Sequence, residues 1–242
     1  MNNLLLSLKQ FCYGVHRRIF RYVDFRGLRI PLDNPPVSRK IHQQLRRKTY
    51  EFPEINAILQ LLSFGDRVLE IGSGLGIVSS LVAKSGKASA IRSYEANPDL
   101  LPFIAKLHSI NSVVNVELVN QILLPSPSEP YVNFHIHKSF AESSVLQHHA
   151  VDKIVSVETR DVNSVLKEFS PQILVCDIEG GESILFKDID LGGIRALVIE
   201  LHPAMISRES IDMIYQVCDS FELYPVESLS SQNVVAFVSA KV

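Results

Sequence analysis

The chain has few cysteines and no long apolar run, and both absences narrow its class. Only three cysteines occur among its 242 residues, namely Cys12, Cys176 and Cys218. They form no CxxC pair and leave one thiol over, so they fit neither a cysteine-based metal site nor a disulfide framework. No apolar stretch reaches the roughly 20 residues that cross a bilayer, and residues 1–11 lack the positive start and the cleavage site of a signal peptide. We therefore expect a cytoplasmic protein.

Negative charge is nearly missing from the N-terminal segment. Residues 1–48 carry eleven lysines and arginines but only Asp24 and Asp33, a balance of +9. Because the whole chain carries −2, residues 49–242 carry −11. A basic arm on an acidic body predicts a peripheral contact with a membrane surface or an anionic partner, or else a solvated face. The arm has few interleaved aromatic residues for base stacking, so we expect no specific nucleic-acid partner.

Two regions of the chain differ in their apolar periodicity. Residues 1–62 predict a basic helical extension with one short extended segment at 24–32. In residues 63–242, strand patterns alternate with helix patterns, which predicts a parallel sheet with helical crossovers. An insertion at 131–159 is interpreted as a substrate-side element. The expected helices are 4–23, 41–62 (interrupted at Pro53), 77–84, 99–109, 162–169, 183–186 and 208–220, and the expected strands are 67–71, 90–95, 116–120, 131–137, 153–157, 173–178, 196–201, 222–226 and 234–239.

A glycine-rich turn follows the first strand of the second region. An apolar strand ending in Glu70-Ile71 runs into Gly72-Ser73-Gly74-Leu75-Gly76 and then into a helix pattern. Glycines let a ligand approach the backbone closely, and a helix N-terminus offers free N–H groups to an anion. Dinucleotide enzymes place G-x-G-x-x-G here, but Ile77 stands where the third glycine would be. S-adenosylmethionine offers a carboxylate to the N–H groups and an ammonium to Glu70, whereas that acid would repel a pyrophosphate.

The ends of the next two strands extend this candidate cofactor site. Glu95, followed by Ala96, ends the second strand, where a carboxylate accepts both hydroxyls of a ribose. NAD and S-adenosylmethionine both carry a ribose, so Glu95 does not distinguish them. Asn120 and Gln121 end the third strand, and their amides are candidates for hydrogen bonds to the adenine edge. The alternative for Asn120 and Gln121 is an ordinary turn.

Acidic residues and one histidine end the fourth and fifth strands. The fourth strand leads into Asp177-Ile178-Glu179-Gly180-Gly181-Glu182 and the fifth into Glu200-Leu201-His202. Because side chains alternate along a strand, Asp177 should share a side with Glu179, and Glu200 with His202. Neighbouring strands would bring these four together, where they either deprotonate an alcohol or hold a divalent metal. We expect Asp177 or His202 to be the base, oriented by Glu179 and Glu200, and no metal; if a metal binds, Asp177, Glu179 and His202 are its candidate ligands.

The chain resembles the FkbM family of methyltransferases over nearly its whole length. The most specific match is the D-I-E-G-G-E run at 177–182, and the other matching segments are 50–54 (Y-E-F-P-E), 65–76, 94–98 (Y-E-A-N-P), 143–144 and 200–203 (E-L-H-P). The resemblance implies the class I methyltransferase fold. This is a Rossmann-like, seven-stranded, mostly parallel sheet with an antiparallel last strand and helices on both faces. It also implies S-adenosylmethionine as cofactor and O-methylation of a hydroxyl on a sugar, glycan or other small natural-product acceptor.

The same resemblance implies a set of cofactor contacts. It puts Glu70, Gly72, Gly74 and Glu95 on the cofactor site, and we add Ser73, Gly76 and Asp177 as candidates. It further implies that a motif containing Tyr50, Glu51 and Glu54 closes over the cofactor. Two other functions stay open at this point. One is an NAD-dependent oxidoreductase on a similar sheet, and the other is a non-enzymatic scaffold, which would have no need of the glycine loop and the strand-end acids.

Overall fold

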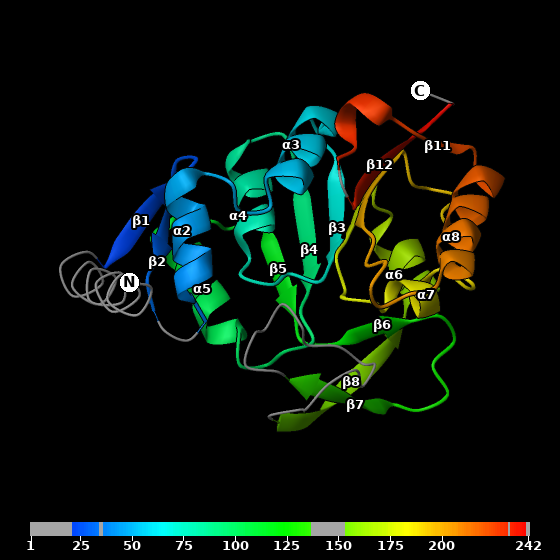
Figure 1. Ribbon diagram of the computed structural model, residues 1–242, viewed down its shortest axis with the longest axis horizontal. Coiled ribbons are helices and arrows are strands. Elements are labelled where there is room, and N and C mark those ends of the chain that lie inside the picture. Colours follow the sequence, from blue (N-terminus) through cyan, green and yellow to red (C-terminus); the bar gives the residue numbers. More distant parts are fainter. Residues whose placement is uncertain (1–20, 34–35, 137–152, 232, 241–242) are drawn as a thin grey trace, which may run out of the picture.

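The computed structural model describes residues 21–33, 36–136, 153–231 and 233–240. Its centre is a seven-stranded sheet (Figure 1). The strands lie in the order β11 (Leu223–Pro225), β12 (Val234–Ser239), β10 (Ala196–Glu200), β9 (Ile173–Cys176), β3 (Arg67–Ile71), β4 (Ala90–Tyr94) and β5 (Val116–Val119). β12 pairs antiparallel with both of its neighbours, and β10, β9, β3, β4 and β5 pair in parallel. The predicted sheet with its antiparallel last strand is confirmed.

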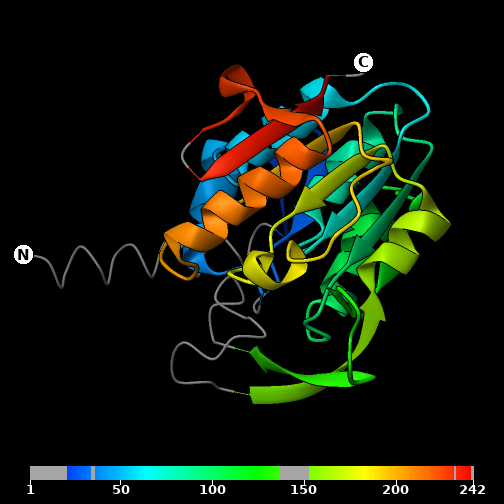
Figure 2. The ribbon, with the colours of Figure 1, turned by 90° about the vertical axis from the view of Figure 1, so that its right-hand side faces the viewer.

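Helices cover both faces of this sheet (Figures 1 and 2). One face packs against α3 (Phe52–Leu61), α4 (Ile77–Lys84) and α5 (Leu101–Ile110), and the other against α6 (Val162–Phe169), α7 (Glu182–Leu185) and α8 (Arg208–Ser220). Successive strand residues serve opposite faces, because side chains alternate along a strand. Val175 of β9 lies in the first core, while Leu174 and Cys176 lie in the second. β9 is therefore apolar and buried at all four positions, as expected of a parallel strand covered on both faces.

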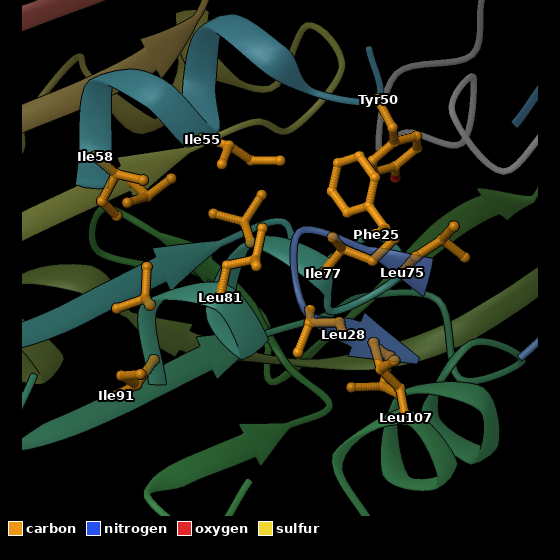
Figure 3. Close-up of a cluster of buried hydrophobic side chains, with 14 of the residues drawn as sticks. Phe25, Leu28, Tyr50, Ile55, Ile58, Leu75, Ile77, Leu81, Ile91 and Leu107 are labelled. Atoms are coloured by element: carbon orange, nitrogen blue, oxygen red, sulfur yellow. The ribbon is translucent and has the colours of Figure 1, made fainter. Parts of the chain in front are cut away.

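A hairpin and a helix precede the sheet. The hairpin consists of β1 (Tyr22–Phe25) and β2 (Leu28–Pro31), and α2 (Arg39–Arg47) follows it. Figure 3 shows Phe25 and Leu28 of the hairpin among side chains from α3 and α5 in the first core. The predicted helix at 4–23 is wrong at its end, because Tyr22 and Val23 pair across the hairpin; residues 4–20 lie outside the described part of the chain. The extended segment around Gly27 is confirmed.

The helical stretch predicted at 41–62 breaks earlier than expected. α2 ends at Arg47 and is capped by Lys48, which adopts a left-handed φ of 59°. α3 begins after Glu51, which has a φ of 41°. Pro53 lies in the first turn of α3, where its missing N–H costs nothing. The proline therefore helps to start the second helix and does not interrupt a continuous one.

A separate three-stranded sheet lies beyond one end of the main sheet (Figures 1 and 2). β8 (Lys153–Asp161) pairs in parallel with β6 (Ile122–Leu124) and antiparallel with β7 (Tyr131–Ile136). β7 and β8 match the two extra strands predicted in the insertion, although β8 continues to Asp161. β6 was not predicted. Ile122 of β6 joins Phe134, Ile136 and Val157 in a small core of its own.

No helix among the described residues is long and apolar enough to cross a membrane.

Candidate functional site

A cavity of about 240 Å³ lies at the carboxyl ends of β3, β4 and β9. Most of the residues predicted for the site line its wall. These are Tyr50, Glu51, Glu54, Gly72, Ser73, Gly74, Glu95, Ala96, Gln121, Asp177 and Glu179. The predicted residues that are not on the wall are Glu70, Gly76, Asn120, Glu200 and His202. The cavity therefore joins the glycine loop, which was expected to hold a cofactor, to the acids that were expected to carry the chemistry.

The glycine loop is held by close backbone packing. Gly72 has a φ of +90°, and its N–H and that of Ser73 both donate to the carbonyl of Tyr94, at 2.9 and 3.0 Å. A Cβ on Gly72 would lie 1.7 Å from the backbone oxygen of Asp177. A Cβ on Gly76, which precedes α4 with a φ of +69°, would lie 2.6 Å from a methyl carbon of Ile104. The close approach of the residue after β9 and of α5 therefore requires glycine at these two positions, whether or not a ligand binds.

Glu70 lies behind the loop and not on the cavity wall. Its side chain is buried, and one oxygen accepts the Ser79 N–H of α4 at 3.0 Å while the other accepts the Ser93 hydroxyl of β4. Burial raises the pKa of Glu70 to about 7, and the bonds from Ser93 and Ser79 oppose that rise. Glu70 therefore links β3 to β4 and to the start of α4. Its predicted contact with a cofactor ammonium stays a prediction.

Glu95 faces the cavity at the end of β4. One of its oxygens accepts the Gly74 N–H at 2.8 Å, and the other accepts the Asn97 N–H at 2.7 Å. Burial raises the pKa of Glu95 to about 7 in spite of these bonds. A carboxylate has about four lone-pair sites, so each oxygen keeps acceptor capacity for a further donor such as a ribose hydroxyl.

The two amides predicted for adenine lie in different settings. The Asn120 amide donates to the backbone carbonyls of Glu95 and Ala96, at 2.7 and 3.1 Å, so it braces the turn after β4. Gln121 lines the cavity and donates to Glu158 of β8 at 3.0 Å. Of the two, only Gln121 is next to the space where a ligand would lie.

Strand-end acids converge on His202, as predicted. Its Nε2 lies 3.2 Å from a carboxylate oxygen of Glu179 and 3.6 Å from one of Asp177. Asp177, Glu200 and His202 each offer a ligand atom within 4.8 Å of the others. The reason given for this convergence was wrong in part, because β9 ends at Cys176. Residues 177–181 turn back through left-handed conformations at Glu179 and Gly180, with φ of 49° and 90°, so a turn and not strand alternation joins Asp177 to Glu179.

Glu182 has a contact that the sequence did not reveal. It is fully buried at the start of α7, and its carboxylate lies 2.8 Å from Nδ1 of His202. Burial lowers the pKa of His202, but the hydrogen bond to Glu182 and the charges of Asp177 and Glu179 outweigh it and raise the pKa to about 9. Glu182 thereby fixes the imidazole so that Nε2 points to the strand-end acids. The D-I-E-G-G-E run was the only signal that could have marked this residue.

A second group of acids reaches Asp177 from the N-terminal part of the chain. Tyr50 packs edge-on against Phe25 of the hairpin, with ring centroids 6.4 Å apart, and Glu51 and Glu54 follow it. The carboxylates of Glu51 and Glu54 each have an oxygen within 4.8 Å of one on Asp177. Burial and the neighbouring carboxylates raise the pKa of Glu54 and of Asp177 well above the usual range. We call the whole set the acid cluster: Glu51, Glu54, Asp177, Glu179, Glu182, Glu200 and His202.

Comparisons with known proteins find similarity only in the fold. No family model matches the sequence, and no curated protein matches it. Similar solved structures include a ribosomal protein L11 methylase from Lactobacillus delbrueckii subsp. bulgaricus (10% identity, TM-score 0.45, covering 78% of this chain and 77% of that one). They also include P. horikoshii TYW2 in complex with MeSAdo (11%, TM-score 0.48, 90% and 68%). A third is a protein in the NADB-Rossmann superfamily from Streptococcus agalactiae (14%, TM-score 0.43, 77% and 67%).

Proposed function

We propose that this chain is an S-adenosylmethionine-dependent methyltransferase that methylates a hydroxyl of a sugar, glycan or other small natural product. The cofactor assignment is supported chiefly by the charge of the cavity wall. Five of the residues that line the cavity are acidic, namely Glu51, Glu54, Glu95, Asp177 and Glu179, and one, Lys40, is basic. Negative potential in a low-dielectric cleft attracts a cation and repels an anion. A sulfonium with an ammonium matches this wall, whereas the doubly anionic pyrophosphate of NAD does not.

The cavity also has the groups that the rest of this cofactor needs. Ile77 and Val78, the first residues of α4, lie on its wall, and a helix N-terminus has free N–H groups that favour a carboxylate. Glu95 has acceptor capacity for the ribose hydroxyls. Ala96 and Ile122 offer apolar surface for the adenine, next to the amide of Gln121. Glu70 lies behind the glycine loop and not on the cavity wall, and its hydrogen bonds to Ser79 and Ser93 stabilise the start of α4 and the end of β4 around that loop.

The acceptor class rests on the FkbM resemblance, and the site favours Asp177 as the base. The bound cofactor would supply an activated methyl group, and the attacking hydroxyl must lose its proton. Asp177 lies on the cavity wall, whereas His202 does not. His202 is held by Glu182 on one nitrogen and faces Glu179 and Asp177 with the other, so its role is to position Asp177. Residues 1–48 would make the peripheral contact with a membrane surface or an anionic partner.

Calorimetric titration with S-adenosylhomocysteine and with NAD tests the cofactor assignment. We expect S-adenosylhomocysteine to bind and NAD not to bind. Glu95→Gln should weaken the binding of S-adenosylhomocysteine by roughly 10- to 100-fold, because hydrogen bonds to a charged acceptor are worth about 1.5–3 kcal/mol. Glu117→Gln is the matched control, since Glu117 is exposed on the neighbouring strand β5 and pairs with Arg92. Binding of NAD alone would reject the proposal in favour of the oxidoreductase.

A comparison of methylated products tests the acceptor class. Extracts of cells with and without the gene would be examined by mass spectrometry for products that differ by one methyl group on oxygen. Methylation confined to nitrogen or carbon would refute the O-methyl part of the proposal and leave the cofactor assignment standing. Binding of S-adenosylhomocysteine with no methylated product in any extract would favour the non-enzymatic scaffold.

A further inference from the structure

Three carboxylates on the cavity wall lie close together, and Asp177 is the one of them that faces the imidazole of His202, at 3.6 Å. Glu51, Glu54 and Asp177 each have an oxygen within 4.8 Å of the others. Like charges this close repel one another strongly once they are removed from water. No lysine or arginine among the described residues forms an ion pair with any of the three. Three acids beside a single imidazole therefore form a site that a bound cation would stabilise.

Glu54 supplies an independent sign that the ligand is a cation. Its side chain is only 4% exposed, and it lines the cavity. Within the described part of the chain, no hydrogen bond or ion pair reaches its carboxylate. A buried carboxylate that lacks a partner is costly, and the fold keeps it facing the oxygens of Glu51 and Asp177. A bound cation would satisfy all three at once.

We propose that Glu51, Glu54 and Asp177 bind one divalent metal ion of the hard, oxygen-preferring class, such as Mg²⁺ or Mn²⁺. Oxygen atoms 4.8 Å apart or less can share one ion, since metal–oxygen bonds of this class are about 2.0–2.6 Å long. Carboxylate and water ligands suit Mg²⁺, Ca²⁺ and Mn²⁺ better than the softer metals. Three protein ligands leave positions for water or for an acceptor that enters the cavity. This ligand set differs from the one expected from sequence, because Glu51 and Glu54 replace Glu179 and His202.

His202 is a positioning residue for this site. Its Nε2 lies 3.6 Å from the Asp177 oxygen Oδ1, which is buried and has no hydrogen-bond partner. Glu182 holds the other ring nitrogen at 2.8 Å. Partners behind a ligand fix its orientation, and their loss typically costs 10- to 100-fold in metal affinity. His202 and Glu182 would fix Asp177 in this way.

The ion would assist the proposed reaction through the acceptor. A hydroxyl bound to a divalent cation has a lowered pKa, and an Asp177 that binds through one oxygen keeps the other to receive the proton. The oxygen–methyl bond then forms as the methyl–sulfur bond breaks, which leaves a neutral thioether. This role rests on the proposed function, whereas the ion site itself does not.

Titration with Mn²⁺, followed by electron paramagnetic resonance, tests the site. We expect the full-length protein to bind one Mn²⁺ per chain, with Mg²⁺ as a competitor, and to keep the ion when S-adenosylhomocysteine is saturating. Glu54→Gln and Asp177→Asn should each weaken binding by at least about 10-fold. Asp99→Asn is the matched control, since Asp99 is an exposed acid that pairs with Lys153, and it should bind Mn²⁺ as the wild type does. Thermal unfolding checks that each variant is folded, and Mn²⁺ should raise the Tm of the wild type but not of Glu54→Gln.

Three results would overturn the site. The first is an absence of stoichiometric Mn²⁺ binding. The second is a Mn²⁺ affinity that Glu54→Gln and Asp177→Asn leave unchanged. The third is loss of Mn²⁺ when S-adenosylhomocysteine binds, because the carboxylates would then belong to the cofactor ammonium. The titration with S-adenosylhomocysteine separates the two proposals. A protein that binds Mn²⁺ but no S-adenosylhomocysteine retains the ion site and loses the proposed function.

Discussion

Gly72 is the point where the glycine loop touches the end of β9, and its replacement by alanine tests how closely the two are coupled. The residue has a φ of +90°, and a Cβ there would lie 1.7 Å from the backbone oxygen of Asp177. A backbone atom cannot rotate away as a side chain can. Gly72→Ala must therefore push the loop and the turn after β9 apart.

Gly65 provides the matched control, because it separates backbone strain from the steric clash. Its φ is +88°, nearly that of Gly72, but nothing lies within 4 Å of a Cβ built on it. Gly65→Ala should cost only the strain of an alanine with positive φ, about 1–2 kcal/mol. Gly72→Ala should cost the same strain and in addition about 1–3 kcal/mol for forcing atoms into a filled space. We expect a total of about 2–5 kcal/mol.

Urea unfolding of both variants gives the two free energies, and calorimetry with S-adenosylhomocysteine gives the effect on the cavity. Gly72→Ala should unfold at a lower urea concentration than Gly65→Ala and should bind S-adenosylhomocysteine more weakly. Gly65→Ala should bind it as the wild type does. Equal free energies of unfolding for the two variants would refute the reasoning, since the clash would then have been relieved at no cost.

Two further predictions concern buried carboxylates away from the acid cluster. Burial raises the pKa of Glu70 to about 7 from a reference of 4.5, so the stability that it contributes when protonated is lost as the pH rises through that range. The wild type should lose this stability between about pH 4 and pH 8, whereas Glu70→Gln has no carboxyl group there to ionise. The free energy of unfolding of Glu70→Gln minus that of the wild type should therefore rise by roughly 3 kcal/mol over this range. Parallel pH profiles for the two proteins would contradict this. Asp66 is buried and lies 2.6 Å from a guanidinium nitrogen of Arg195, so Asp66→Ala should cost about 3 kcal/mol in urea unfolding. Asp33→Ala, which removes the exposed pair with Lys106, should cost less than about 1 kcal/mol, and similar losses for the two would count against burial as the cause.

The main sheet was predictable because its signals are local and repeated. Each central strand is short and rich in apolar residues, each crossover helix has its own periodicity, and turns separate them. The glycine loop was predictable for the same reason, since strand, glycines and helix follow directly in the sequence. The convergence of Asp177, Glu200 and His202 followed from a general rule for parallel sheets, in which neighbouring strands end at the same edge.

What the sequence did not reveal depends on contacts between distant segments. β6 spans three residues, Ile122–Leu124, which is too short for any periodicity, and it becomes a strand by pairing with β8 more than 30 residues away. Tyr22 and Val23 continue a helical pattern, but pairing with Ile30 and Pro31 across the turn outweighs it. The contact between Glu182 and His202 joins two elements through a turn whose path no local rule predicts.

The acid cluster contains two residues with a strained backbone, and both direct a carboxylate to the cavity. Glu51 and Glu179 both have positive φ, 41° and 49°, although neither is a glycine. Such conformations cost about 1–3 kcal/mol each and persist only where the surrounding structure imposes them. One ends the break between α2 and α3, and the other lies in the turn after β9, and both residues line the cavity together with Asp177. Their carboxylates thereby reach the same cavity from segments more than 120 residues apart. Glycine would adopt both conformations at less cost, so glutamate at these two positions puts a carboxylate at the cavity at the expense of backbone strain.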